Sequence, residues 1–351
     1  MSLLSRWFTS EKEEVATEAV VNSATHVITK ELILLQQQAN KLDMSCRSYA
    51  RSSSTGSHHS QFRGRGMDYQ ESRIYQAGDD IRNMDWRVTA RAGKPHTKLY
   101  QEERERPVVL VVDFKPCMFF GSTNTFKSVL AAKTATLIAW SVASKGDRIG
   151  ASILNSSHQE LAPKMGKRGV LQLIRELVIH GNPELGLKQS AEKNHISMNN
   201  ELKRLRRLAK PGSLIFLISD FYDIDEETAG HLQQLSRHND IQAIQIVDPL
   251  ELSPPPPERY AVTDGSASGI VNTKSKKGRD KYTGFFNQHH QKIQDLMRKK
   301  NIPLLQLSTA DDLLLTLQKH FGNSKQRVPI KNSSSDSSKK AKAKNTEGFL
   351  Q

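Results

Sequence analysis

The sequence predicts an α/β fold built on a doubly wound, mostly parallel sheet. Short apolar runs rich in Val, Ile and Leu recur along the chain, and helical patterns lie between them. This alternation is typical of parallel strands covered by helices. The runs are apolar throughout, as central strands buried on both faces require. We therefore expect ligands at the carboxyl ends of the strands.

Five strands are predicted in this way. They are VVLVV (108–112), RIGASIL (148–154), SLIFLIS (213–219), IQAIQIV (241–247) and IPLLQL (302–307). Helical patterns cover residues 126–147, 196–213 and 223–240, and the first of these ends at Gly146, a residue common after a helix. Residues 28–43 predict an additional amphipathic helix through Leu32, Leu35, Ala39 and Leu42.

The composition of the flanking segments divides the chain. We predict an N-terminal extension (1–27), a helix with a charged arm (28–106), the α/β domain (107–322) and a disordered basic tail (323–351). Residues 51–66 are rich in Ser, Gly and His and predict a loop. Four prolines at 254–257 precede a predicted small hairpin, an insertion near 250–280.

The overall composition excludes several classes of protein. The 351 residues include 51 Lys and Arg against 37 Asp and Glu, for a formal net charge of +14. No apolar run approaches the length of about 18 residues that a membrane span needs, and no signal peptide is visible. Cys46 and Cys117 are the only cysteines, too few for a disulfide scaffold. We expect a cytoplasmic protein with reduced thiols and no membrane span.

Acidic and basic residues are most densely mixed just before the first strand. The signature residues of this segment are Arg73, Asp79, Asp80, Arg82, Asp85, Trp86, Arg87 and Arg91. Further charges follow at Lys94, Lys98, Glu102, Glu103, Arg104, Glu105 and Arg106. One interpretation is an ion-pair network that fastens this arm to the α/β core. In the other, the arginines bind a phosphate or a partner's carboxylates bidentately. Charge spacing alone leaves both open.

This segment resembles the bacterial domain-of-unknown-function family fifty-eight. The stretch GRGMDYQESRIYQAGDDIRNMDWRVTARAGKPHTKLYQEERERPVVLVVDF is similar to its pattern of a GRG turn, ESR-x-Y-x-x-GDD-x-R-x-x-DW-R-x-x-AR, and K-x-Y-x-E-ERE before a strand. The resemblance covers about residues 28–320. It implies a von Willebrand factor A-like fold, frequent operation beside a MoxR-type AAA ATPase, and no established enzymatic activity.

In von Willebrand factor A folds, the resemblance implies a divalent metal held by an Asp-x-Ser-x-Ser loop, a threonine and a second aspartate. Asp113 and Asp220 stand where the two carboxylates belong, but Lys115 and Cys117 replace the two serines. An ammonium repels a hard cation and a thiol binds it poorly. Residues 180–197 also offer no matching threonine. We predict a degenerate site without metal or other cofactor, in which Lys115 or a neighbouring arginine balances the carboxylates.

Three functions remain in order of preference. The first is a non-catalytic protein-interaction module or assembly adaptor, with an AAA ATPase as partner. Its predicted contact residues are Asp113, Lys115, Phe119, Phe120, Asp220, Phe221 and Tyr222. The second is non-specific nucleic-acid binding through the basic segments 202–210, 271–300 and 325–344. The third, a metal-dependent hydrolase, needs more carboxylates than the strand ends provide. No phosphate-binding loop, nucleophile elbow or histidine pair at helical spacing is present.

Overall fold

The computed structural model describes residues 23–42, 67–102, 107–155, 159–190, 197–263 and 268–321. The predicted loop at 51–66 and the predicted tail at 323–351 lie outside these residues, as does most of the N-terminal extension.

A six-stranded sheet forms the centre of the molecule. Its strands, in spatial order, are β10 (Leu304–Ser308), β7 (Asp240–Val247), β6 (Leu214–Ser219), β3 (Val108–Asp113), β4 (Arg148–Leu154) and β5 (Gln159–Met165). All neighbours pair in parallel except β5, which is antiparallel to β4. This confirms the predicted α/β class and all five predicted strands.

The sixth strand, β5, was not predicted because its sequence lacks an apolar run. Of its seven residues only Leu161 is buried, and Pro163 and Lys164 are exposed. A strand at the edge of a sheet can carry such residues because one side of its backbone needs no partner.

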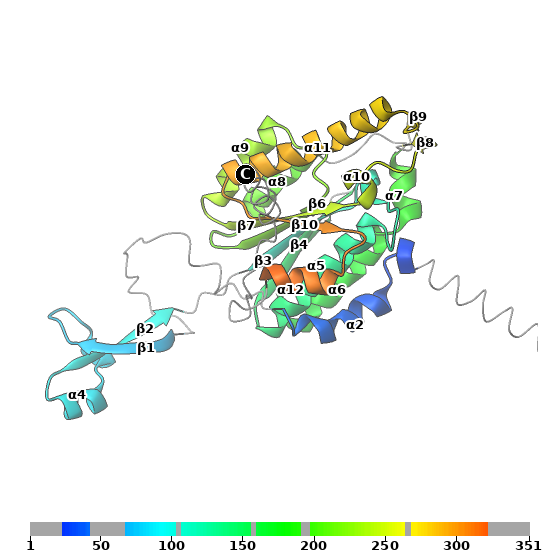
Figure 1. Ribbon diagram of the computed structural model, residues 1–351. Helices are drawn as coiled ribbons and strands as arrows, with labels where there is room; N and C mark the ends of the chain where they lie inside the picture. Colours follow the sequence, from blue (N-terminus) through cyan, green and yellow to red (C-terminus); the bar gives the residue numbers. More distant parts are fainter. Residues whose placement is uncertain are drawn as a thin grey trace, which may run out of the picture.

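Helices cover both faces of the sheet (Figure 1). One face packs on α2 (Thr29–Ala39), α5 (Lys127–Ser144), α6 (Gly166–His180) and α12 (Leu313–Phe321), and the other on α8 (Met198–Leu208), α9 (Glu226–Ser236) and α11 (Lys276–Lys299). Alternate residues of β3 divide between the two cores: Val108, Leu110 and Val112 join the first, and Val109 and Val111 the second. The sheet is therefore doubly wound.

The helix α5 is buried along most of its length because it lies between the sheet and other helices. The indole nitrogen of Trp140 donates to the Leu32 carbonyl at 3.1 Å, and Ser141 donates to the Leu42 carbonyl at 2.9 Å. These bonds hold α2 on α5. By its packing α2 lies with the α/β domain, whereas the sequence placed it with the arm.

The charged arm forms a separate small unit. It consists of β1 (Met67–Ile74) paired antiparallel with β2 (His96–Glu102), a short helix η1 (Ile81–Asn83) and α4 (Trp86–Ala92). Figure 1 shows this unit projecting from one end of the α/β layers. We call it the hairpin arm.

The remaining elements surround the carboxyl edge of the sheet and the predicted insertion. They are η2 (Pro116–Met118), α7 (Pro183–Ser190), α10 (Pro249–Leu252), β8 (Arg259–Thr263) and β9 (Ser268–Asn272). β8 and β9 form the predicted hairpin. The basic segment 271–300, for which the sequence predicted no helix, contains the 24-residue α11. Among the described residues, no helix is long and apolar enough to cross a bilayer.

Candidate functional site

The carboxyl edge of the sheet gathers acidic side chains from adjacent strands. Asp113 ends β3, while Asp220 follows β6 and Asp248 follows β7. Because β3, β6 and β7 are parallel neighbours, all three carboxylates reach the same edge. The prediction that Asp113 and Asp220 lie at neighbouring strand ends is confirmed by this topology.

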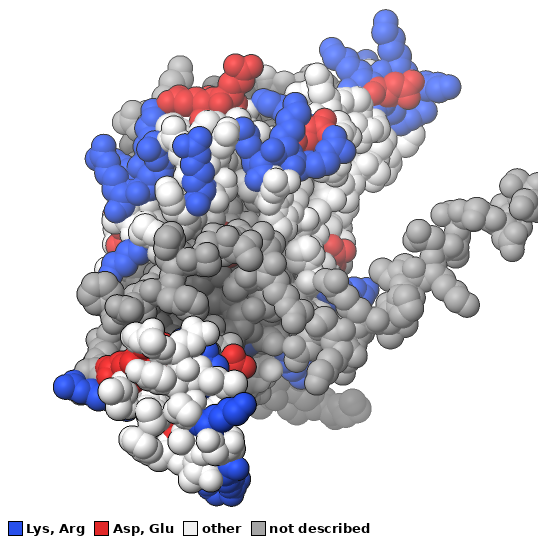
Figure 2. Space-filling view, turned by 90° about the vertical axis from the view of Figure 1, so that its left-hand side faces the viewer, with Lys and Arg blue, Asp and Glu red and all other residues white. Residues whose placement is uncertain are grey.

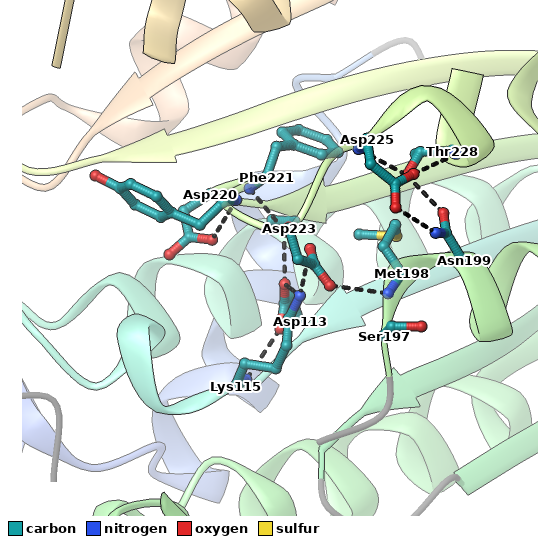
Figure 3. Close-up of polar contacts among 12 residues, drawn as sticks. Asp113, Lys115, Ser197, Met198, Asn199, Asp220, Phe221, Asp223, Asp225 and Thr228 are labelled. Carbon is teal, nitrogen blue, oxygen red and sulfur yellow. Dashed lines mark hydrogen bonds and ion pairs between the residues drawn. The ribbon is translucent and has the colours of Figure 1, made fainter. Parts of the chain in front are cut away.

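Lys115 bridges two of the acids at this edge. Its Nζ lies 3.1 Å from Asp113 Oδ2 and 2.7 Å from Asp223 Oδ1. Asp113 also accepts hydrogen bonds from the Ser219 hydroxyl at 2.6 Å and from the Lys115 backbone N–H at 2.9 Å. Figure 3 shows Asp223 between this pair and the start of α8, where it accepts from the Met198 N–H. Lys115 therefore joins the end of β3 to the loop after β6.

A second buried lysine, Lys127, performs the same role for Asp220. It is the first residue of α5, and its Nζ lies 3.0 Å from Asp220 Oδ2 and 2.7 Å from Glu251 Oε1. Both Lys127 and Asp220 are almost completely buried. We call Asp113, Lys115, Lys127, Asp220, Asp223 and Glu251 the strand-end cluster. The sequence indicated neither Lys127 nor Glu251, although a lysine among the small and apolar residues of α5 was the available signal.

The two lysines stay protonated at neutral pH. Burial alone would lower the pKa of Lys127, but Asp220 and Glu251 raise it far above the usual range. Asp113 and Asp223 act in the same way on the pKa of Lys115, against the effect of burial. Although burial opposes them, Lys127 and Lys115 hold the pKa of Asp220 below its usual value. Burial raises the pKa of Asp113 in spite of Lys115. The cluster is thus held by buried ion pairs.

The divalent metal that the resemblance implies does not fit this arrangement. The ammonium groups of Lys115 and Lys127 lie 3.1 Å and 3.0 Å from the carboxylate oxygens that would bind it. A cation cannot approach those oxygens without displacing a charged group that is itself hydrogen-bonded. Within the described ranges, no group of three or more His, Cys, Asp or Glu residues is placed to hold a metal ion.

The predicted aromatic contact residues divide into buried and exposed ones. Phe221 is buried in the second core, and its backbone has φ 60°. Phe119 is buried beside Phe114, with ring centroids 6.4 Å apart, and under Gly186 of α7. Neither can contact a partner in this conformation, so their prediction as surface residues is wrong. Phe120 is 43% exposed and is the most exposed aromatic residue of this set.

Tyr222 is half-buried and belongs to an aromatic stack. Its ring lies parallel to that of His289 with centroids 4.2 Å apart, and Lys127 Nζ lies 5.4 Å from the centroid of the Tyr222 ring. Burial and the carboxylates of Glu251 and Asp220 raise the pKa of Tyr222. The phenol is therefore neutral, and its ring fixes α11 to the loop after β6.

Cys117 lies between the two halves of the cluster. The residue is exposed as a whole, but protein packed around its thiol, together with Asp220 and Asp113, raises the pKa of the thiol well above its usual value. Since the thiolate is the nucleophilic form, this environment disfavours it. The thiol also hydrogen-bonds to Asp220.

Asp248 was not among the predicted contact residues, yet it connects three loops. It accepts hydrogen bonds from the Ser122 N–H at 2.8 Å and from the Ser122 hydroxyl, from the Leu250 N–H at 3.0 Å and from the Thr309 hydroxyl at 2.8 Å. These donors precede α5, begin α10 and follow β10. Asp248 therefore fixes the loops on one side of the strand-end cluster.

The acids of the hairpin arm fold the arm itself. Asp79 pairs with Arg73 at 2.7 Å, Asp80 caps η1, and Asp85 caps α4 while accepting from Ser72 at 2.8 Å. The side chains of Trp86, Arg82, Arg87 and Arg91 are exposed. The sequence also predicted an ion-pair network between the arm and the α/β core, and part of it involved residues 103–106, which lie outside the described residues. The ion pair of Arg73 with Asp79 lies within the arm.

Comparison with known proteins places the chain in a family. The family model described as "Protein of unknown function DUF58" matches residues 71–292. An uncharacterized protein of Mycobacterium tuberculosis is 28% identical over 262 residues, 74% of this chain and 80% of that protein. An uncharacterized protein of Mycobacterium bovis matches with the same identity and coverage.

Solved structures of similar fold include BatB, a conserved hypothetical protein of Bacteroides thetaiotaomicron, with a TM-score of 0.38 and 9% identity over 60% of this chain and 95% of that chain. They also include a von Willebrand factor type A protein of Catenulispora acidiphila, with a TM-score of 0.27 and 13% identity over 43% of this chain and 35% of that chain. The family match covers well over half of the 351 residues, and this chain belongs to the DUF58 family of proteins of unknown function.

Proposed function

We propose that this chain is a non-catalytic protein-interaction module or assembly adaptor whose partner is a MoxR-type AAA ATPase. The observation that carries the proposal is the strand-end cluster, in which Lys115 and Lys127 engage both strand-end carboxylates. Acid–base or metal chemistry at this edge would need a carboxylate open to substrate. The ion pairs instead give the edge a fixed shape on which loops are displayed.

Phe120 and the loop around it form the surface that this proposal assigns to the partner. The backbone carbonyl of Phe120 accepts from the Lys127 N–H at 2.8 Å, so the loop is fixed at the start of α5, beside the buried ion pair. An exposed aromatic side chain on a rigid loop is the type of residue that dominates protein interfaces. Pairing with an ATPase is what the family resemblance implies.

Binding to the purified ATPase encoded in the same genome tests the proposal. The wild-type chain is expected to bind it in biolayer interferometry, and Phe120→Ala to weaken binding about tenfold or more. Leu171→Ala is the matched control: Leu171 is 47% exposed near the start of α6, which follows Met165, and Met165 pairs with Arg148 at the opposite end of β4 from the strand-end edge. Absence of binding by the wild-type chain would contradict the proposal of an ATPase partner. Equal binding by all three proteins would contradict the assigned surface.

The alternative of nucleic-acid binding depends on the basic residues of α8, of α11 and of the short segment before α11. Acidic residues lie among them: Lys203 pairs with Glu227 at 2.6 Å, and Arg298 with Asp295 at 2.7 Å. Figure 2 shows red acidic groups beside blue basic groups across the upper part of the molecule. A mixed surface attracts a polyanion less than a uniformly basic one. Tight, salt-sensitive binding of DNA or RNA lost on neutralising Lys274, Lys276 and Lys277 would favour this alternative.

A further inference from the structure

Three large apolar side chains of the hairpin arm are exposed. Ile74, Ile81 and Trp86 are 57%, 61% and 67% exposed. Between residues 71 and 98, whose side chains are described, the buried ones are Asp85 and Thr97, both polar. An isolated two-stranded hairpin is marginally stable in water. Burial of these three side chains against another surface would stabilise the arm. The arm is therefore a candidate interaction surface.

The charges around these apolar residues show what can cover them. Residues 67–102 contain six Lys and Arg and six Asp and Glu, so the arm carries no formal net charge, whereas the whole chain carries +14. The positive net charge of each copy opposes the association of two copies, but the neutral arm adds nothing to this repulsion. A polyanion, conversely, gains no long-range attraction at a neutral unit.

The arm also presents charges of both signs at its surface. Arg82, Arg87 and Arg91 are exposed and have no side-chain partner among the described residues, and Glu71 and Asp80 are exposed acids of the same unit. Figure 2 shows an uncharged white area on the arm with red and blue groups at its margins. A two-fold contact uses the same patch from both copies and must be self-complementary. An apolar centre with a rim of mixed charge meets that condition.

We propose that the hairpin arm is the surface through which two copies of this chain associate as a two-fold dimer. Ile74, Ile81 and Trp86 form the centre of the contact, and arginines of one copy face acids of the other at its rim. This contact is distinct from the strand-end loops assigned to the ATPase and does not depend on that assignment. A dimer would present two strand-end edges to one oligomeric partner.

Sedimentation velocity of the full chain over a concentration series tests this proposal. The wild type is expected to show a concentration-dependent monomer–dimer equilibrium. Ile81→Glu places an unpaired charge in the apolar centre and Trp86→Ala removes an aromatic anchor; each is expected to weaken dimerisation about tenfold or more. Ile270→Glu is the matched control, because Ile270 is 75% exposed on β9, away from the arm.

A second variant separates contact from folding. Arg87→Glu changes an exposed side chain that makes no hydrogen bond or ion pair with the described residues. The arm is therefore expected to keep its fold while like charges meet at the rim, and dimerisation is again expected to fall. A wild-type chain that remains monomeric throughout the series overturns the proposal and leaves the arm to a different protein. Dimers that survive both Ile81→Glu and Arg87→Glu, or that Ile270→Glu disrupts equally, overturn it as well.

Discussion

Lys127 illustrates how one side chain determines the chemistry of the whole edge. Its ammonium is buried at the first residue of α5 and contacts two carboxylates, Asp220 at 3.0 Å and Glu251 at 2.7 Å. A buried ion pair adds little stability relative to a well-packed apolar pair, but removal of one partner leaves the other charge unpaired in a medium of low polarity. Lys127 is therefore required for stability because Asp220 and Glu251 are buried beside it.

Replacement of Lys127 by methionine tests this requirement. Lys127→Met keeps the volume but leaves Asp220 and Glu251 without their cation, and we expect the free energy of unfolding to fall by about 3–5 kcal/mol. Lys133→Met is the matched control: Lys133 lies on the same helix and pairs with Glu31 at 3.0 Å near the surface, a pair expected to contribute at most about 1 kcal/mol. Chemical denaturation measures both. An equal decrease in the free energy of unfolding in the two variants would contradict the claim that the buried acids require Lys127.

The helices of the α/β domain differ in how tightly their glycines are packed. In α7, Gly186 lies so close to Phe119 that a Cβ at this position would be 2.0 Å from the ring. At Gly230 of α9, the corresponding Cβ position has no atom within 4 Å apart from the neighbouring backbone of its own helix. Two helical glycines thus occupy opposite environments, one required by packing and the other not.

The same substitution at these two glycines is expected to have opposite effects. Gly186→Ala forces α7 away from the buried Phe119 ring, at a cost of about 1–3 kcal/mol for overpacking. Gly230→Ala meets no neighbour and raises helix propensity, which is expected to stabilise the chain by up to about 1 kcal/mol. Thermal unfolding followed by circular dichroism measures the sign of both changes. Stabilisation by Gly186→Ala would show that α7 does not rest on Phe119.

The loops joined by Asp248 give the fold a specific dependence on pH. Burial alone would raise the pKa of this carboxyl, but hydrogen bonds from Ser122, Leu250 and Thr309 lower it below its usual value of 3.8. A lowered pKa in the folded state means that the ionised group stabilises the fold above about pH 4. This stabilisation is lost as the pH falls through the lowered value.

Asp248→Asn is expected to lower the free energy of unfolding at neutral pH by about 1–3 kcal/mol, because its amide cannot accept all of these bonds. The loss of stability on acidification below about pH 4 should be smaller in this variant than in the wild type. Asp295→Asn, on α11 beside Arg298, is the control and should follow the wild-type curve. Parallel acid-unfolding curves for wild type and Asp248→Asn would contradict the assignment.

Elements were predictable from sequence where local pattern and burial agree. The strands β3, β4, β6 and β7 are buried on both faces, and β10 contains three leucines, so all five were found, whereas β5 buries only Leu161 and was missed. The helix α11 was missed because it has few apolar residues that face the core. Ile293 and Met297 are buried and Phe286 is half-buried, but many lysines lie between them in the sequence. A pattern of sparse apolar residues in a basic segment does not distinguish a solvated helix from a loop.

Across the whole molecule, prediction of the site was limited by contacts between distant segments. Asp113, Asp220 and Lys115 could be found because each lies directly beside a strand end. Glu251 pairs with Lys127, 124 positions earlier, and no local pattern signals such a pair. Phe221 looked like a surface anchor because it follows a strand, but its left-handed backbone turns the side chain into the core.

The central claim is that lysine ammonium groups hold the carboxyl edge of the sheet, where the sequence resemblance implies a divalent metal. Thermal unfolding of the full chain with and without millimolar Mg²⁺ or Mn²⁺, at matched ionic strength, tests it most directly. A metal a hundredfold above its dissociation constant would add about 2.7 kcal/mol to the free energy of unfolding. We predict no change in melting temperature. A clear increase with either metal, abolished by Asp113→Ala, would contradict the claim.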